Sequence, residues 1–465
     1  MCGIVGYIGP QQAAPIILEG LARLEYRGYD SAGLAVLGSE LRTAKQAGRV
    51  RDLAQAVPKR FPGKVGIGHT RWATHGPATD INAHPHVDAT NTIAVVHNGI
   101  IDNSAALRAE LTGAGIELTS DTDTEVIAHL VSRSEADTLE GKVLDALSRV
   151  HGTYGLAVMH AEFPDRIVVA RNGSPLIIGV GNKEMFLASD LAALVRYTRT
   201  VVHLDDGDLA TITANDYRTF TRTEPVTART ASVVDLNVED YEQGDHAHFM
   251  VKEIQEQPDA VERVLRGRLD ERFATARLGG LNLEPHELRA IRRVKILGCG
   301  SAYYVGQMGA TMIEELARIP ADAEAASEFR YRDPVIEHDT LYVAVSQSGE
   351  TIDTLLAVQE IQRKGGRCIG VINVVGSTIA RECMGGMYLH AGPEVAVAST
   401  KALTNMGVGF ALLALTLARV RDLSFTNGQR ILDGLQKLPD QIRRVLDQEQ
   451  DIAIVAKELA EANSL

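Results

Sequence analysis

The chain has 465 residues, of which 45% are hydrophobic and 23% charged, a composition typical of a soluble protein with two or three domains. Its formal net charge of −13 argues against a nucleic-acid or anionic-membrane partner, because neither polyanion attracts an acidic surface. The cysteines form no CxxC pair, which excludes a disulfide scaffold and gives no zinc spacing; they are Cys2, Cys299, Cys368 and Cys383. We therefore expect a cytoplasmic protein that binds no metal.

Short apolar runs separated by Gly, Asn or Asp turns predict a largely antiparallel sheet in the first half of the chain. Helical periodicity in the same half predicts helices that pack on the faces of this sheet. We expect one domain over residues 2–215. The predicted strands are 92–101, 155–162, 166–173, 174–181 and 184–190, and the predicted helices are 12–25, 104–113, 122–134 and 139–149.

Residues 216–288 lose the strand pattern and become acidic, which predicts a linker. Continuous apolar strands then alternate with helices, and this order predicts a doubly wound parallel α/β domain over 289–425. The uncharged stretch 402–418 is short for a membrane span, and we interpret it as a buried helix. Residues 426–465 are amphipathic and predict a helical tail.

Cys2 directly follows Met1, and this position is chemically informative. Removal of Met1 would give one residue both a nucleophilic thiol and a free α-amine. An α-amine titrates at about pH 7.7 to 8.0, which suits a general base in neutral solution. The alternative is a small buried residue that opens the first strand.

Acyl transfer from an amide also needs an oxyanion hole. Asn98 and Gly99 end a predicted strand, where a side-chain amide and an unhindered backbone N–H could face a developing oxyanion. An ordinary hairpin turn is the alternative for this pair. His84 and His86 could bind a metal, but no carboxylate or cysteine set accompanies them, and we expect hydrogen-bonded structural residues instead.

The charges of a substrate need partners as well. Arg71, beside the single tryptophan Trp72, could bind a carboxylate, or it could be a surface arginine next to a half-buried aromatic. Asp123 could meet a substrate ammonium group. Alternatively, Thr122 and Glu125 form a capping box, and Asp123 is then an ordinary first-turn acid of the helix.

Three segments rich in Gly, Ser and Thr precede predicted helices in the second half, at 298–304, 346–351 and 395–404. Such loops bind phosphate through free N–H groups and hydroxyls at helix N-termini. A dinucleotide fingerprint is disfavoured, because the third glycine of GxGxxG would fall at Tyr303. Ordinary helix caps are the remaining alternative.

Six segments of the first half together resemble the glutaminase domain of the N-terminal-nucleophile amidotransferases, most closely in the glucosamine-6-phosphate synthase family. They are MCGIVGYIG, LEYRGYDSAGLAV, HTRWATHG, NAHPHV, HNGII and SDTDTEVIAHL. The resemblance implies an αββα sandwich in which Cys2 attacks the side-chain amide of glutamine. It also implies an oxyanion hole of Asn98 and Gly99, and glutamine binding by Arg71, Thr74, His75 and Asp123, with Trp72 as a gate.

With ASEFRYR, the loops of the second half resemble the sugar isomerase domain of the same family. This resemblance implies that fructose 6-phosphate and glutamine give glucosamine 6-phosphate and glutamate without a cofactor, in a homodimer formed through the sugar isomerase domains. Ser301 and Ala302 stand where the family often has Thr-Ser, so one hydroxyl is missing. The implied contacts are Cys299, Gly300, Ser301, Ser346, Gln347, Ser348, Thr351, Val397 and Ser399.

The family carries a second sugar isomerase domain, with a lysine that forms a Schiff base with the ketose. The sequence stops at Leu465, where that domain would begin, and Lys401 does not match that lysine. We therefore expect a truncated form that hydrolyses glutamine and lacks key synthase groups. Two alternatives stay open: an amidotransferase of the same class with another ammonia acceptor, and a non-catalytic sugar-phosphate sensor.

Overall fold

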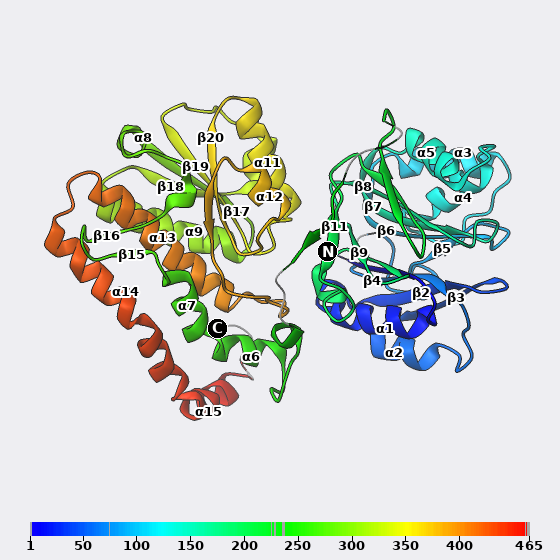
Figure 1. Cartoon of the computed structure of the whole chain (residues 1–465), viewed down its shortest axis with the longest axis horizontal. Coiled ribbons are helices and arrows are strands. Elements are labelled where there is room, and N and C mark those ends of the chain that lie inside the picture. Colours follow the sequence, from blue (N-terminus) through cyan, green and yellow to red (C-terminus); the bar gives the residue numbers. More distant parts are fainter. Residues whose placement is uncertain are drawn as a thin grey trace. The chain divides into compact units, whose positions relative to one another are not determined.

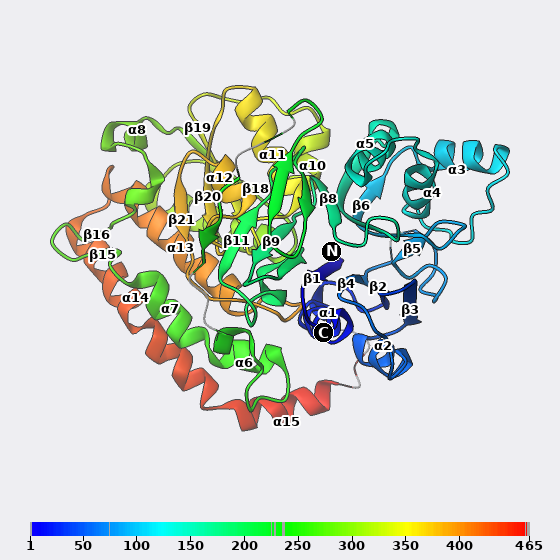
Figure 2. The same ribbon diagram turned by 45° about the vertical axis from the view of Figure 1, so that its right-hand side comes forward.

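The structure, a computed structural model, describes residues 2–73, 75–224, 226, 229–234, 238–460 and 462. The chain divides into two compact units, Met1–Tyr241 and Glu242–Leu465, and each is described by itself. Figure 1 and Figure 2 show the course of the chain through both units.

The first unit contains two antiparallel sheets. One has eight strands in the order β14-β11-β9-β10-β1-β4-β2-β3, and the other has six in the order β13-β12-β8-β7-β6-β5. The strands are β1 (Gly3–Ile8), β2 (Ser31–Leu37), β3 (Leu41–Ala47), β4 (Val65–Arg71), β5 (His86–Val87), β6 (Ile93–Ile101), β7 (Gly152–His160), β8 (Ile167–Asn172), β9 (Ile177–Val180), β10 (Met185–Ala188), β11 (Thr200–His203), β12 (Leu209–Ile212), β13 (Tyr217–Phe220) and β14 (Ser232–Val233).

The two sheets face each other across an apolar core to which Ile4 and Ile67 of one sheet and Val96 and Met159 of the other contribute. Outside the first sheet, α1 (Ala13–Arg23) and α2 (Val50–Ala56) bury their apolar sides. Outside the second sheet lie α3 (Ser104–Gly113), α4 (Glu125–Arg133) and α5 (Leu139–Arg149) (Figure 1). The result is the expected four-layer αββα sandwich.

The second unit is built on a five-stranded parallel sheet in the order β18-β17-β19-β20-β21. The expected doubly wound domain is therefore present. The strands are β17 (Arg293–Gly298), β18 (Ala321–Ala325), β19 (Thr340–Ser346), β20 (Arg367–Ile372) and β21 (Gly386–Tyr388). Two apolar cores cover the two faces of this sheet. One contains α9 (Ser301–Ala317) and α13 (Lys401–Arg419), and the other contains α10 (Ala326–Tyr331), α11 (Ile352–Arg363) and α12 (Thr378–Glu382).

Residues 216–288, expected as a linker, contribute elements to both units. β13 and β14 join the sheets of the first unit, whereas α7 (Gln257–Leu265) packs in the second unit. α7 buries Val261 and Val264 against Leu412 of α13 and Leu435 of α14 (Phe425–Leu446). The segment also forms α6 (Phe249–Gln255), β15 (Leu269–Asp270), β16 (Thr275–Ala276) and α8 (Pro285–Ala290). The end of the acidic stretch was expected to be helical, and α6 and α7 lie there. Helices α14 and α15 (Glu449–Leu459) form the expected helical tail.

Helix α13 is long and apolar enough, by length and composition alone, to cross a membrane, but 83% of its apolar window is buried inside the protein. Phe410, Leu413 and Leu417 of α13 pack in the core beside the parallel sheet. This matches the expected buried helix, because a core helix of an α/β domain is apolar on most sides.

Candidate active site

Cys2 lies at the start of β1, beside the end of β4. The antiparallel pairing sets Gly3 opposite Thr70, so Cys2 lies level with Arg71, one residue before Trp72. The backbone N–H of Trp72 donates a hydrogen bond to Cys2 Sγ at 3.2 Å. Burial raises the pKa of the Cys2 thiol, and the Trp72 N–H opposes that rise. A nearby base is therefore needed to take the thiol proton.

Asn98 lies inside β6, so the hairpin-turn alternative is excluded: the strand continues to Ile101 and pairs Asn98 with Gly155 of β7. Its side-chain Nδ2 donates to the carbonyl oxygen of Cys2 at 2.9 Å. An amide nitrogen carries two hydrogens. Across the part of the chain that the structure describes, the second hydrogen has no protein acceptor, so it is available beside the nucleophile.

Gly99 adopts a backbone conformation that other residues rarely tolerate, with φ +138°. A Cβ atom at this position would lie 2.0 Å from the carbonyl oxygen of Thr153 on the neighbouring strand. Glycine is therefore required next to Asn98, because any side chain would push β6 away from β7.

Arg71 ends β4, and its guanidinium holds the following loop. Its Nη1 donates to the Pro77 carbonyl at 3.1 Å, and its Nη2 donates to the carbonyls of His75 and Gly76. Arginine has five N–H donors, so two remain for a ligand. The side chain is buried, which lowers the pKa of Arg71. A buried guanidinium with spare donors suits a carboxylate ligand.

The loop after Arg71 contains the other expected glutamine-binding residues. Asp30 holds this loop, because its Oδ2 accepts the N–H of Ala73 at 2.8 Å. Trp72 is 42% exposed and contacts the edge of Tyr29 with ring centroids 5.4 Å apart. His75 is half-buried, and Thr74 lies outside the described residues.

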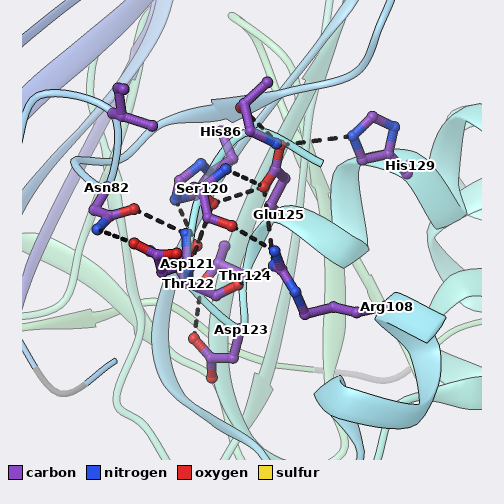
Figure 3. A network of polar contacts seen from close by, with 12 residues as sticks. Asn82, His86, Arg108, Ser120, Asp121, Thr122, Asp123, Thr124, Glu125 and His129 are labelled. Atoms are coloured by element: carbon purple, nitrogen blue, oxygen red, sulfur yellow. Dashed lines mark hydrogen bonds and ion pairs between the residues drawn. The ribbon is translucent and has the colours of Figure 1, made fainter. Parts of the chain in front are cut away.

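The expected capping box of Thr122 and Glu125 is wrong. Helix α4 begins at Glu125, and Thr122 Oγ1 instead contacts His86 Nε2 at 2.9 Å. Asp123 precedes the helix (Figure 3). Its Oδ2 accepts the backbone N–H of Ile101 at 2.8 Å, two residues beyond Gly99. The carboxylate of Asp123 is thus fixed at the end of the strand that carries Asn98.

Glu125 is the centre of the polar network in Figure 3. Its buried carboxylate accepts the backbone N–H groups of Thr119 and Ser120 at 2.7 Å each and both of their hydroxyls. Arg108 donates to the carbonyls of Ser120 and Thr122. Although desolvation opposes it, the pKa of Glu125 is well below its usual value, because these donors and His129 favour the charged form. This network orders the loop that carries Asp123.

The buried histidines His69, His84 and His86 form a column of contacting rings next to Asn98. The ring of His69 stacks on that of His84 at 4.2 Å between centroids, and His84 meets the edge of His86 at 4.7 Å. His84 Nδ1 accepts the backbone N–H of His97 at 3.3 Å. Within the described ranges, no group of three or more His, Cys, Asp or Glu side chains is placed to hold a metal ion.

Sequence reasoning missed His69, Asp30 and Glu125 as residues that support the site. His69 was part of the quoted segment HTRWATHG, but only the two strand pairings of β4 show that it points toward Asn98. Its spacing of two from Arg71 on a strand was the available signal, because alternate residues share one face of a sheet.

In the second unit, the expected phosphate loops follow the carboxyl ends of β17 and β19. Leu297 pairs with Ala344 in these neighbouring parallel strands, so the loops beginning at Cys299 and Gln347 lie at one edge of the sheet. The strand order reverses between β17 and β19, and ligands of doubly wound sheets bind at such a position. Gly300 and Ser301 are exposed at the first turn of α9, and Cys299 is half-buried.

The hydroxyls of the second loop are ordered. Buried Ser346 Oγ accepts the backbone N–H of Gly349 at 2.9 Å and lies 3.2 Å from Thr351 Oγ1. Ser348 Oγ accepts the N–H of Glu350 at 3.1 Å. Gln347, Ser348 and Thr351 are half-buried before helix α11. Free N–H groups and hydroxyls at two helix starts suit an anion.

The third segment precedes α13, and buried Glu394 organises it. Its Oε2 accepts the Ser399 hydroxyl at 2.7 Å, and its Oε1 accepts the N–H of Thr400 at 2.8 Å. Val397 is 70% exposed, whereas Ser399 is half-buried. Lys401 is buried and forms an ion pair with Glu256 at 2.5 Å, so it is a structural cation of this unit.

Two family models match the chain: a glutamine amidotransferase domain over residues 69–196 and a SIS domain over 287–416. A curated relative from Chlorobaculum tepidum is named glutamine–fructose-6-phosphate aminotransferase [isomerizing] and is 45% identical. The match covers 100% of this chain and 77% of the relative. The chain belongs to this family. An aminotransferase of the same name from Thermus thermophilus is 47% identical, with 99% of this chain and 76% of the relative covered.

Among solved structures, the C-terminal domain of the Francisella tularensis glucosamine-fructose-6-phosphate aminotransferase is similar at 28% identity. The match covers 47% of this chain and 61% of the solved chain, with a TM-score of 0.44. As a member of the glutamine–fructose-6-phosphate aminotransferase family, the chain is an enzyme with a glutamine amidotransferase domain and a SIS domain.

Proposed function

We propose that the first unit hydrolyses the side-chain amide of glutamine with Cys2 as nucleophile. The observation that carries this proposal is that the Asn98 amide contacts the residue that bears the thiol, with Nδ2 of Asn98 2.9 Å from the Cys2 carbonyl oxygen. Nucleophile and oxyanion donor thus share one end of the two sheets. The amidotransferase names of the relatives point to glutamine as the amide.

In the proposed reaction, removal of Met1 frees the α-amine of Cys2, which takes the thiol proton. The thiolate attacks the amide carbon, and the oxyanion accepts hydrogen bonds from Asn98 Nδ2 and the Gly99 N–H. The C–N bond breaks as the ammonium group returns its proton to the leaving nitrogen, which departs as ammonia. Water then attacks the thioester and transfers a proton to the amine, and glutamate leaves with the thiol restored.

The remaining residues bind the amino-acid end of glutamine. We assign the carboxylate to Arg71, which keeps two N–H donors, and the ammonium group to Asp123. His75 and Thr74 complete the loop over the substrate, and Trp72 gates the site. Asp123 and Asn98 are fixed on the same strand end, so substrate binding and oxyanion stabilisation depend on one rigid element.

For the second unit, we propose that it binds the phosphate and part of the sugar of fructose 6-phosphate. In the overall reaction of the family, glutamine and fructose 6-phosphate give glutamate and glucosamine 6-phosphate. The phosphate contacts are assigned to the loops after β17 and β19, and the sugar contacts to the segment before α13. The residues are Cys299, Gly300, Ser301, Ser346, Gln347, Ser348, Thr351, Val397 and Ser399. We further propose a cytoplasmic homodimer formed through this unit, with no nucleic-acid partner, in keeping with the net charge of −13.

Glutamate release from glutamine by the purified full chain tests the proposal. We expect Cys2→Ala to abolish the reaction and Cys383→Ala, which changes a buried thiol of the second unit, to retain it. Intact mass after treatment with 6-diazo-5-oxo-L-norleucine should show one adduct on protein without Met1, and none on Cys2→Ala. Glutamate release by Cys2→Ala, or full activity with Met1 retained, would refute the proposed chemistry.

A further inference from the structure

His69 contacts the side-chain amide of Asn98, which the proposed function assigns to stabilise the oxyanion. Its Nε2 atom lies 3.0 Å from Asn98 Oδ1 and 3.1 Å from the carbonyl oxygen of His97. The ring is buried, with 1% of the residue exposed. Nδ1, on the other side of the ring, is buried and has no hydrogen-bond partner among the described residues.

These contacts decide which nitrogen carries the proton. The His97 carbonyl can only accept, so a hydrogen bond to it requires hydrogen on Nε2. Burial lowers the pKa of His69 to about 3, and the ring is therefore neutral, with Nδ1 unprotonated. Stacking on His84 fixes the plane of the ring.

The same proton decides the orientation of Asn98. The two ends of a carboxamide have nearly the same shape, and their hydrogen-bond partners determine which end faces which way. Because Nε2 of His69 donates, it favours the oxygen end of Asn98 on its side. The nitrogen end must then face Cys2, and Nδ2 indeed donates to the Cys2 carbonyl.

We propose that His69 is a positioning residue that holds the Asn98 carboxamide with its N–H group toward the nucleophile. This inference rests on the proposed glutamine hydrolysis at Cys2. Without the His69 donor, the amide can rotate and present its oxygen, which repels the developing oxyanion instead of stabilising it. His69 acts through Asn98 and has no hydrogen bond to Cys2 or Trp72 in the described structure.

A double-mutant cycle separates this role from a general structural one. We expect His69→Leu to lower kcat for glutamate release by about 10-fold to 100-fold. This loss does not exceed the roughly 10²-fold to 10³-fold loss that follows removal of an oxyanion donor itself. KM for glutamine should stay within about twofold, because the Arg71 and Asp123 contacts are intact. In an Asn98→Ala background, His69→Leu should change kcat by less than about twofold.

Two further variants control for loss of a buried histidine. In His69→Gln, the side-chain amide can place a donor near the position of Nε2, and it should recover most of the kcat lost in His69→Leu. His86→Gln alters another histidine of the same column, whose ring contacts Thr122. The fold-decreases in kcat caused by His86→Gln and by Asn98→Ala should multiply in the double variant. His69→Gln also keeps the test informative if His69→Leu does not fold.

The outcomes distinguish the two proposals. Glutamate release by Cys2→Ala would refute the proposed function. If Cys2→Ala is inactive and the effects of His69→Leu and Asn98→Ala multiply, the positioning role is wrong while the chemistry stands. Wild-type kcat in His69→Leu, or a His69→Gln variant as slow as His69→Leu, would also overturn the positioning role.

Discussion

The Asn98 side-chain amide donates to the carbonyl oxygen of Cys2 across 2.9 Å, although 96 residues separate the two in the chain. Cys2 directly precedes β1 of the eight-stranded sheet, and Asn98 lies in β6 of the six-stranded sheet. The nucleophile and the donor for its oxyanion therefore belong to different sheets, and the packing between the sheets sets their separation.

Asn98→Ala should reduce kcat for glutamate release by about 10² to 10³ with little change in KM, because the donor acts on charge that develops only in the transition state. Steady-state kinetics with glutamine checks this. Asn98→Asp is the matched control of similar shape, and it should be at least as slow, since a carboxylate repels the oxyanion. An Asn98→Ala variant with unchanged kcat would remove Asn98 from the oxyanion hole.

Gly99→Ala should destabilise the first unit by about 3 kcal/mol or more, because its φ of +138° and the close Thr153 carbonyl both exclude a Cβ. Urea unfolding followed by the fluorescence of the single tryptophan, Trp72, reports on this unit. Gly113→Ala is the control: beyond its chain neighbours and its own helix backbone, a Cβ added to this helical glycine would have no atom within 4 Å, and alanine should stabilise by about 0.5 to 1 kcal/mol. Equal stabilities would contradict the strain argument.

The first unit should lose stability as the pH falls below about 6.5. Burial lowers the pKa of His69 to about 3 and holds the pKa values of His84, His86 and His97 below the usual range. The unfolded chain takes up protons at these positions that the folded unit does not, so acid favours unfolding, by up to about 1.4 kcal/mol per pH unit for each histidine.

Unfolding curves of the full chain between pH 4 and pH 8, read from Trp72 fluorescence, measure this dependence. His69→Gln removes one of these groups and should flatten the slope between pH 4 and pH 6.5. A slope identical to that of the wild type would show that His69 takes up its proton in the folded state.

Ser346→Ala should weaken binding of fructose 6-phosphate to the second unit, because its hydroxyl orders the loop through Gly349 and Thr351. A ligand present at about 100 times its Kd stabilises the folded state by about 2.7 kcal/mol, so thermal unfolding with and without the sugar phosphate detects the loss. Ser424→Ala is the control: it removes the N-cap of α14 and should lower Tm while keeping the ligand-induced shift. Equal shifts in both variants would exclude Ser346 from the site.

Much of the fold followed from local patterns. The predicted helices 104–113 and 139–149 have the bounds of α3 and α5, and the predicted alternation of strands and helices over 289–425 includes β17, β19 and β20 with their helices. Such elements are predictable because the spacing of apolar residues records which face is buried. The predicted capping box of Thr122 and Glu125 is absent because both side chains have other partners. Thr122 contacts His86, and Glu125 accepts the Ser120 hydroxyl.

The sequence by itself determined the chemistry that is present: a cysteine after Met1, the Asn98-Gly99 pair, and loops of hydroxyls before helices. The tertiary structure alone decided how these groups are oriented. In the folded protein, Asn98 lies within a strand and not in a turn, and three N–H donors of Arg71 bind loop carbonyls. The His69 ring contacts the Asn98 amide. The physical reason is that hydrogen-bond direction depends on strand register and on the packing between sheets, which join residues far apart in the chain.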